Sequence, residues 1–213
     1  MIMQLGENPW LLIGLTFLEI LFIIIPALIT GKVEKRPFNI VIKEMGFQKT
    51  EKKFLKIILG INFGIGFYFI SIYISTFFRD LIIKNLFSSD FVEQAQEGLI
   101  NTVTIQPSLI QLIILILLQI FIVGPCEEAF FRGFLIKKME IKLKLTYSVI
   151  ISSVFFTFYH IPPFIVPIST IITFFGYYFA FGVLLSLIFV FSDYSLLICS
   201  VTHSFFNVLL LLI

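Results

Sequence analysis

Two carboxylates and a guanidinium, those of Glu127, Glu128 and Arg132, occur within six consecutive residues of the chain. Apolar residues flank these six on both sides. The preceding segment, Gly98 to Cys126, contains no Asp, Glu, Lys or Arg. If this is a membrane helix, each charge costs about 2.5–3.5 kcal/mol, so the three cost about 8–10 kcal/mol when unpaired. Side chains with this cost are usually kept for function. The alternative is that all three cap the cytoplasmic end of a membrane span.

Helical spacing separates the two carboxylates. Glu128 and Arg132 are four residues apart, so they lie on one helix face and can form an ion pair. Glu127 points roughly 140° away from Arg132 around the helix axis. We therefore expect Glu128 and Arg132 to support the site structurally. Glu127 is left to face a cavity, where a buried carboxyl group suits general-base work better than a solvated one.

The chain has only two histidines, and both lie in apolar segments. His203 and Asn207 are four residues apart, so their polar groups project from one helix face. A single histidine in a membrane helix can also serve only as an interhelical hydrogen-bonding group. However, at about 1.5 Å per residue, Glu127, His160 and His203 lie about 16, 20 and 14 Å from the cytoplasmic edge. This similar depth predicts that three helices bring them together.

The composition indicates an all-α, polytopic membrane protein. Hydrophobic residues make up 59% of the chain and charged residues 13%, with a mean hydropathy of +1.06, which excludes a soluble domain. We expect the lipid bilayer as a partner and, because no basic patch is visible, no nucleic acid. Cys126 and Cys199 lie in apolar runs and are predicted to be buried free thiols.

The apolar segments predict a bundle of about six transmembrane helices: Trp10–Ile29, Phe54–Phe78, Ser108–Lys138, Tyr147–Ile161, Ile168–Phe191 and Leu196–Ile213. The segment Gly31–Lys53 carries seven Lys and Arg against three Asp and Glu, so the positive-inside rule places it in the cytoplasm. Both termini are then outside. Glu19 lies inside the first span, where we expect it to face other helices or to reach the interface rather than to act in catalysis.

Three ordered motifs carry a family resemblance. Glu127-Glu128-x-x-x-Arg132, Phe156-x-x-x-His160 and His203-x-x-x-Asn207 resemble the motifs of the CPBP family of intramembrane proteases. This family includes the Rce1-type CAAX prenyl endopeptidases and the Abi proteins linked to bacteriocin processing and self-immunity. The resemblance covers about half of the chain. It predicts a catalytic core over residues 106–213, preceded by a two-span region, residues 1–105, without a family motif.

The resemblance implies hydrolysis of a peptide bond inside the membrane, in a multi-pass protein (of the cell membrane, if the source is prokaryotic) whose active site opens toward the cytoplasm. It implies that Glu127 and His160 activate a water molecule, while His203 and Asn207 stabilise the oxyanion. Two donors four residues apart on one helix suit such an oxyanion hole. The implied substrate is a membrane-associated peptide or protein, and a prenylated CAAX-like protein and a leader peptide both remain open.

Three alternatives remain. Glu127, His160 and His203 could hold a catalytic zinc ion, but no His-Glu-x-x-His helix is present, so we favour metal-free, glutamate-type hydrolysis without a cofactor. The chain could instead be a non-catalytic bacteriocin-immunity or interaction protein with the same fold. It could also be a proton-coupled transporter with a Glu and His relay, although no internal repeat supports this.

Overall fold

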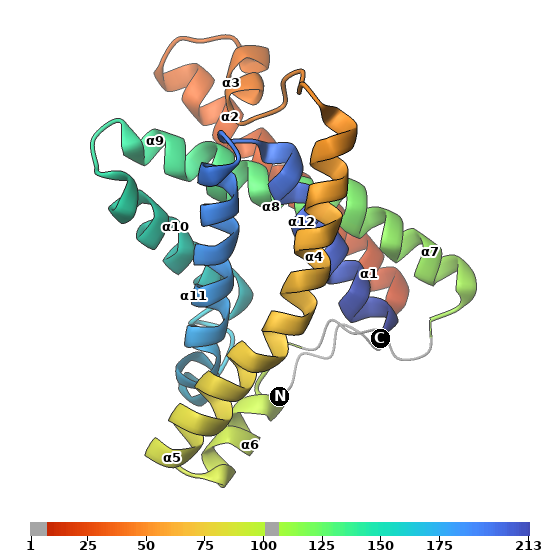
Figure 1. Ribbon diagram of the computed structural model, residues 1–213, viewed down its shortest axis with the longest axis vertical. Helices are drawn as coiled ribbons and strands as arrows, with labels where there is room; N and C mark the ends of the chain where they lie inside the picture. Colours follow the sequence, from red (N-terminus) through yellow and green to blue (C-terminus); the bar gives the residue numbers. More distant parts are fainter. Residues whose placement is uncertain (1–7, 101–106) are drawn as a thin grey trace.

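The computed structural model describes residues 8–100 and 107–213, and these residues contain helices but no strand (Figure 1). This confirms the predicted all-α class. Within these two ranges, four helices are long and apolar enough to cross a membrane: Pro9–Val33, Lys53–Leu86, Leu109–Glu140 and Ile168–Phe191. The chain is therefore an integral membrane protein of several spans.

The first long helix consists of α1 (Pro9–Thr16), η2 (Phe17–Ile20) and α2 (Leu21–Val33). The Asn8 side chain accepts hydrogen bonds from the backbone N–H groups of Trp10 and Leu11. Asn at this position and Pro9 at the first helical position are favourable because both suit the unpaired donors of a helix start. The short helix α3 (Phe38–Glu44) follows in the basic segment.

The second long helix is longer than predicted. It joins α4 (Lys53–Ser75), η3 (Thr76–Ile83) and α5 (Lys84–Leu86) into 34 residues, whereas about 20 suffice to cross the hydrocarbon core. The amphipathic helix α6 (Ser89–Glu97) then turns back, and the Ser88 side chain accepts a hydrogen bond from the Phe91 backbone at its start. In Figure 1, α5 and α6 form the end of the molecule below the bundle.

The third long helix carries the charged motif and alternates between α and π geometry. Its parts are α7 (Leu109–Leu118), η4 (Gln119–Val123), α8 (Gly124–Glu128), η5 (Ala129–Ile136) and α9 (Lys137–Glu140). Both η4 and η5 are π-helical.

The last three helices are α10 (Leu145–His160), α11 (Ile168–Phe191) and α12 (Leu196–Leu212). Asp193 and Tyr194 both have φ near +55°, and this left-handed pair makes the tight turn between α11 and α12. At 16 and 17 residues, α10 and α12 are shorter than a typical span of about 20 residues. The predicted number of six spans is therefore approximate.

Helix α12 packs against both α4 and α8, and Figure 1 shows it beside α4. Glycines allow these close contacts. A Cβ atom on Gly64 would lie 2.9 Å from the Thr202 carbonyl oxygen, and one on Gly124 would lie 2.0 Å from Ser204 Oγ. Small residues at helix crossings allow membrane helices to approach closely.

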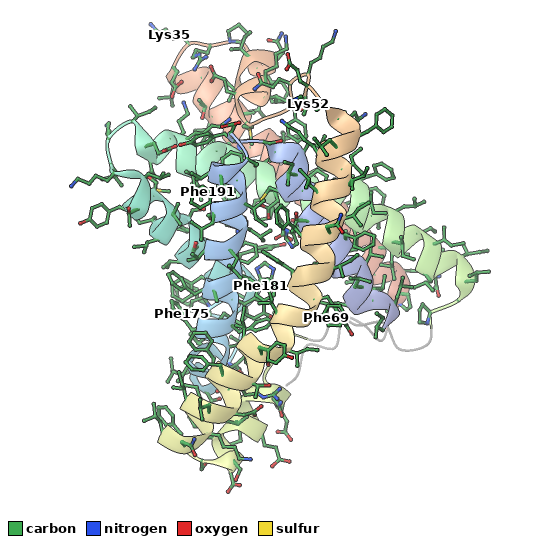
Figure 2. All side chains as sticks on the ribbon, in the orientation of Figure 1. Lys35, Lys52, Phe69, Phe175, Phe181 and Phe191 are labelled. Carbon is green, nitrogen blue, oxygen red and sulfur yellow. The ribbon has the colours of Figure 1, made fainter. Side chains whose placement is uncertain are left out.

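Large apolar side chains lie on the surface, as expected for a protein in lipid, as well as in the core. Phe191 is 83% exposed and Phe69 58% exposed, whereas Phe181 is buried and its ring lies 5.5 Å from that of Phe67 on α4 (Figure 2). Within the described residues, the buried Asp, Glu, Lys and Arg side chains are those of Glu127, Glu128 and Arg132. The molecule therefore concentrates its buried charge at one place.

Candidate active site

The two motif carboxylates lie at the end of α8, between the π-helical segments η4 and η5. A π segment holds extra residues per turn, so it rotates the side chains that follow relative to a regular α-helix, and such segments are frequent at functional sites. Ser152 Oγ of α10 donates a hydrogen bond of 2.7 Å to the Phe131 carbonyl within η5. This bond fixes α10 against the segment that follows the carboxylates.

Glu128 holds several helices together. Its Oε1 atom accepts a hydrogen bond of 2.9 Å from Arg132 Nη1, the ion pair predicted from the spacing, and both side chains are fully buried. The other guanidinium nitrogen of Arg132, Nη2, donates to the Gly182 carbonyl of α11 at 3.0 Å. Glu128 Oε1 also lies 2.8 Å from His203 Nδ1, and Oε2 accepts from the Cys199 thiol at 2.8 Å. Glu128 and Arg132 thereby link their own helix to α11 and α12, although Arg132 Nε is buried without a hydrogen-bond partner among the described residues.

Glu127 has a different environment. Its Oε2 atom is buried without a hydrogen-bond partner and lies 3.8 Å from His160 Nε2, which is too far for a direct hydrogen bond. His160 Nδ1 lies 2.9 Å from the Phe156 carbonyl. Because a carbonyl only accepts, Nδ1 carries the proton, and Nε2 of the neutral ring is an acceptor. Glu127 Oε2 and His160 Nε2 are thus two hydrogen-bond acceptors that face each other. A molecule that donates two hydrogen bonds, such as water, suits the gap between them.

His203 and Asn207 project from the same side of α12. With Nδ1 of His203 bound to Glu128, the ring nitrogen Nε2 remains for the cavity that His203 lines. Asn207 Nδ2 donates a hydrogen bond of 2.9 Å to Gln119 Oε1 at the start of η4. This bond fixes the orientation of the Asn207 amide, which has a second N–H on the same nitrogen.

A cavity of about 490 Å³ joins these groups. Glu127, His160, His203 and Asn207 all line it. His160 therefore borders a cavity rather than close packing. Aromatic and aliphatic side chains form most of the remaining wall: Leu12, Leu15, Ile100, Val123, Phe156, Tyr159, Tyr177, Tyr178, Phe181, Leu185, Phe206, Leu210 and Leu211.

Comparison with known proteins identifies the half of the chain that carries the motifs. Residues 109–209 match the family described as type II CAAX prenyl endopeptidase Rce1-like. They form an Rce1-like domain. The match confirms the resemblance stated from the three motifs and includes every residue of those motifs.

An uncharacterised protein of Mycoplasma capricolum subsp. capricolum is 29% identical to the chain over 164 residues. The aligned part covers 76% of this chain and 46% of that relative, so the chain spans about half the length of the curated relative that it matches. No solved structure matches the chain significantly.

The Rce1-like domain is not the sole source of site residues. Glu19 of η2, outside the matched residues, also lines the cavity, and Tyr159 donates a hydrogen bond to its Oε1 atom. We expected Glu19 to face other helices, and it does contact α10, but its place at the cavity was missed. Gln119 and Cys199 were likewise not predicted to contact residues of the site. The available signal for Glu19 and Gln119 was that each is an isolated polar residue in an apolar run.

A zinc ion at this site would need three ligands from the protein. In the described parts of the chain, no group of three or more His, Cys, Asp and Glu side chains is arranged to hold a metal ion. Glu127 and His160 approach each other, while His203 contacts Glu128 through Nδ1 and has Nε2 left for the cavity. The described residues therefore show no preformed three-ligand zinc site, and metal-free hydrolysis stays a prediction.

Cys126 and Cys199 are free and buried, as predicted. The division of the chain between residues 1–105 and 106–213 stays a prediction.

Proposed function

We propose that the protein is an intramembrane endopeptidase that hydrolyses a peptide bond with a water molecule activated by Glu127 and His160. The family match supports protease activity in general. The observation that carries the specific proposal is the approach of Glu127 Oε2, buried and unpartnered, to His160 Nε2 at 3.8 Å on the cavity wall.

A water molecule placed about 2.8 Å from both atoms would donate one hydrogen to each. Its oxygen lone pairs would then point away from Glu127 and His160, toward a substrate carbonyl in the cavity. As the oxygen forms its bond to the carbonyl carbon, Glu127 takes one proton from the water. When the C–N bond breaks, this proton passes from Glu127 to the leaving amine nitrogen. The second water proton stays on the new carboxyl group and then transfers to the amine, so the products are a carboxylate and an ammonium group.

His203 and Asn207 would stabilise the oxyanion of the tetrahedral intermediate. Asn207 offers the N–H that is not used by Gln119. His203 donates from Nε2 when its ring is protonated, and Glu128 lies at Nδ1 to balance that charge. Donors that are held in place before the reaction stabilise developing charge most effectively. Arg132 balances the charge of Glu128 and contacts no reacting atom in this scheme.

The substrate class in this proposal is a membrane-associated peptide that reaches the cavity from the cytoplasmic side. The orientation rests on the basic segment Gly31–Lys53, which the positive-inside rule places in the cytoplasm. A prenylated CAAX-like peptide and an unprenylated leader peptide are the two chemical candidates.

The test uses purified protein in proteoliposomes, incubated with libraries of prenylated and unprenylated peptides. Cleavage products are identified by mass spectrometry, with and without a chelator. We expect cleavage that survives the chelator and is lost in Glu127→Gln. Loss of cleavage in the chelator, with recovery after zinc is added, would favour the zinc alternative instead.

The non-catalytic alternative is tested with the same variant. Cells that express the wild-type chain or Glu127→Gln are compared for resistance to bacteriocin. A phenotype that persists in Glu127→Gln, together with no cleavage by the wild-type protein, would support an immunity or interaction protein.

A further inference from the structure

Glu19 is a carboxylate near the middle of the first long helix, and the proposed hydrolysis does not use it. It lies in η2, in the 25-residue apolar helix Pro9–Val33. An acidic side chain in the middle of a membrane span is expensive and generally marks a functional site. Because Glu19 lies outside residues 109–209, the family match assigns it no role.

Its hydrogen bonding is incomplete. The Tyr159 hydroxyl donates to Oε1, but Oε2 is buried and has no partner within the described residues. An unpaired buried carboxylate oxygen costs more than an ordinary missing hydrogen bond. Tyr159 alone therefore does not account for the carboxylate, and a second donor is needed when the cavity is filled.

The charges around the cavity indicate what that donor is. Glu19 and Glu127 both line it, and each has one buried oxygen without a partner. Among the described residues, no Lys or Arg lines the cavity. Arg132 is directed elsewhere, with its guanidinium bound to Glu128 and to the Gly182 carbonyl. Two carboxylates in apolar surroundings repel each other unless a cation lies between them or one is neutralised.

The wall beside Glu19 is largely apolar. Thr16 also lines it, but its hydroxyl donates to the Leu12 carbonyl. Leu12 and Leu15, from the same helix, line the cavity next to Glu19. A long aliphatic stem with a charged end fits such a site, because Lys and Arg side chains bury their methylene groups against apolar surfaces while the charged end reaches a polar partner. A peptide N–H would supply a hydrogen bond but no compensating charge.

We propose that Glu19 binds a Lys or Arg side chain of the substrate, close to the bond that is cleaved. This inference rests on the proposed function, because it names the kind of peptide that the same cavity takes. The basic side chain would satisfy Glu19 Oε2 and would leave Glu127 free to act on water. The first helix would thereby select the substrate, while the Rce1-like domain carries out the hydrolysis.

The experiment uses pairs of otherwise identical peptides in which one residue near the cleavage site is either Lys or norleucine. Norleucine keeps the aliphatic stem and lacks the charge. Wild-type protein, Glu19→Gln and Glu19→Asp are compared in proteoliposomes, and kcat/KM is measured for both peptides. Glu51→Gln is the matched control, since Glu51 is exposed in the segment before α4.

We expect the wild-type and Glu51→Gln proteins to prefer the Lys peptide by at least about tenfold, the usual range for a hydrogen bond to a charged group. In Glu19→Gln, which keeps an acceptor for Tyr159, the ratio of the two kcat/KM values should fall to about one. Glu19→Asp should retain part of the preference because it keeps the charge. Equal use of both peptides by the wild-type protein would overturn the inference while leaving hydrolysis intact. An equal loss for both peptides in Glu19→Gln would also overturn it.

A binding measurement distinguishes failure of this inference from failure of the proposed function. Fluorescently labelled peptides of both kinds are titrated into the wild-type and Glu19→Gln proteins, and anisotropy gives Kd. If the wild-type protein cleaves nothing but binds the Lys peptide at least about tenfold more tightly, and Glu19→Gln loses this difference, the proposed function fails and the binding role stands. If no binding difference is found either, both fail.

Discussion

Glu128 Oε1 lies 2.8 Å from His203 Nδ1, so the carboxylate that pairs with Arg132 also orients the histidine of α12. The two acidic residues of the motif therefore have different surroundings although they are adjacent in the chain. Glu128 is bound to Arg132, His203 and Cys199, whereas Glu127 Oε2 has no partner and faces His160. The first two predictions below test this division of roles.

Glu127→Gln should abolish most cleavage without unfolding the protein, because the amide cannot take a proton from water. We expect a loss of about 10²–10⁴-fold in kcat, the range for general acid–base catalysis. Peptide cleavage is measured for Glu127→Gln and Glu128→Gln at matched amounts of folded protein. If Glu127→Gln keeps most of the activity while Glu128→Gln has none, the roles are assigned the wrong way round.

Arg132→Ala should lower stability more than it affects the chemistry directly. The change leaves the fully buried carboxylate of Glu128 without its cation, and breaking a buried pair in this way typically costs about 3–5 kcal/mol. Thermal unfolding in detergent is the measurement, with the exposed Lys142→Ala as the control. An Arg132→Ala protein of wild-type stability but without activity would instead place Arg132 in the chemistry.

Asn207→Ala should reduce kcat by about 10²–10³-fold, the usual cost of removing one oxyanion donor. Gln119→Ala should have a smaller effect, because Gln119 orients the Asn207 amide and does not itself contact the substrate in this scheme. Single-turnover cleavage by the two variants is compared. Retention of more than about a tenth of the wild-type rate in Asn207→Ala would argue against the oxyanion role.

Gly64→Ala and Gly66→Ala should differ sharply, although the two positions are two residues apart on α4. A Cβ on Gly64 would lie 2.9 Å from Phe205 Cβ and from the Thr202 carbonyl oxygen, whereas a Cβ on Gly66 has nothing within 4 Å. Gly64→Ala should therefore destabilise the protein by about 1–3 kcal/mol through overpacking. Gly66→Ala should be neutral or slightly stabilising, because alanine favours helix more than glycine. Equal melting temperatures would show that α12 can move away from α4 at little cost.

The sequence by itself determined the all-α membrane class and the motif residues. These follow from local properties. Long apolar runs need helices in order to satisfy their backbone groups in lipid. The Glu128–Arg132 pair was also predictable, because residues four apart on one helix are neighbours whatever the rest of the fold does. The functional roles of Glu127, His160, His203 and Asn207 stay predictions.

Only the tertiary structure decided which groups meet across helices. The sequence gives no rotation of one helix against another, and the π segments η4 and η5 alter the rotation expected from regular α-helices. The contacts of Gln119 with Asn207 and of Cys199 with Glu128 therefore appear only in the fold. Glu19 is the largest such case, because residues 19 and 127 line one cavity only once the first helix packs beside α8.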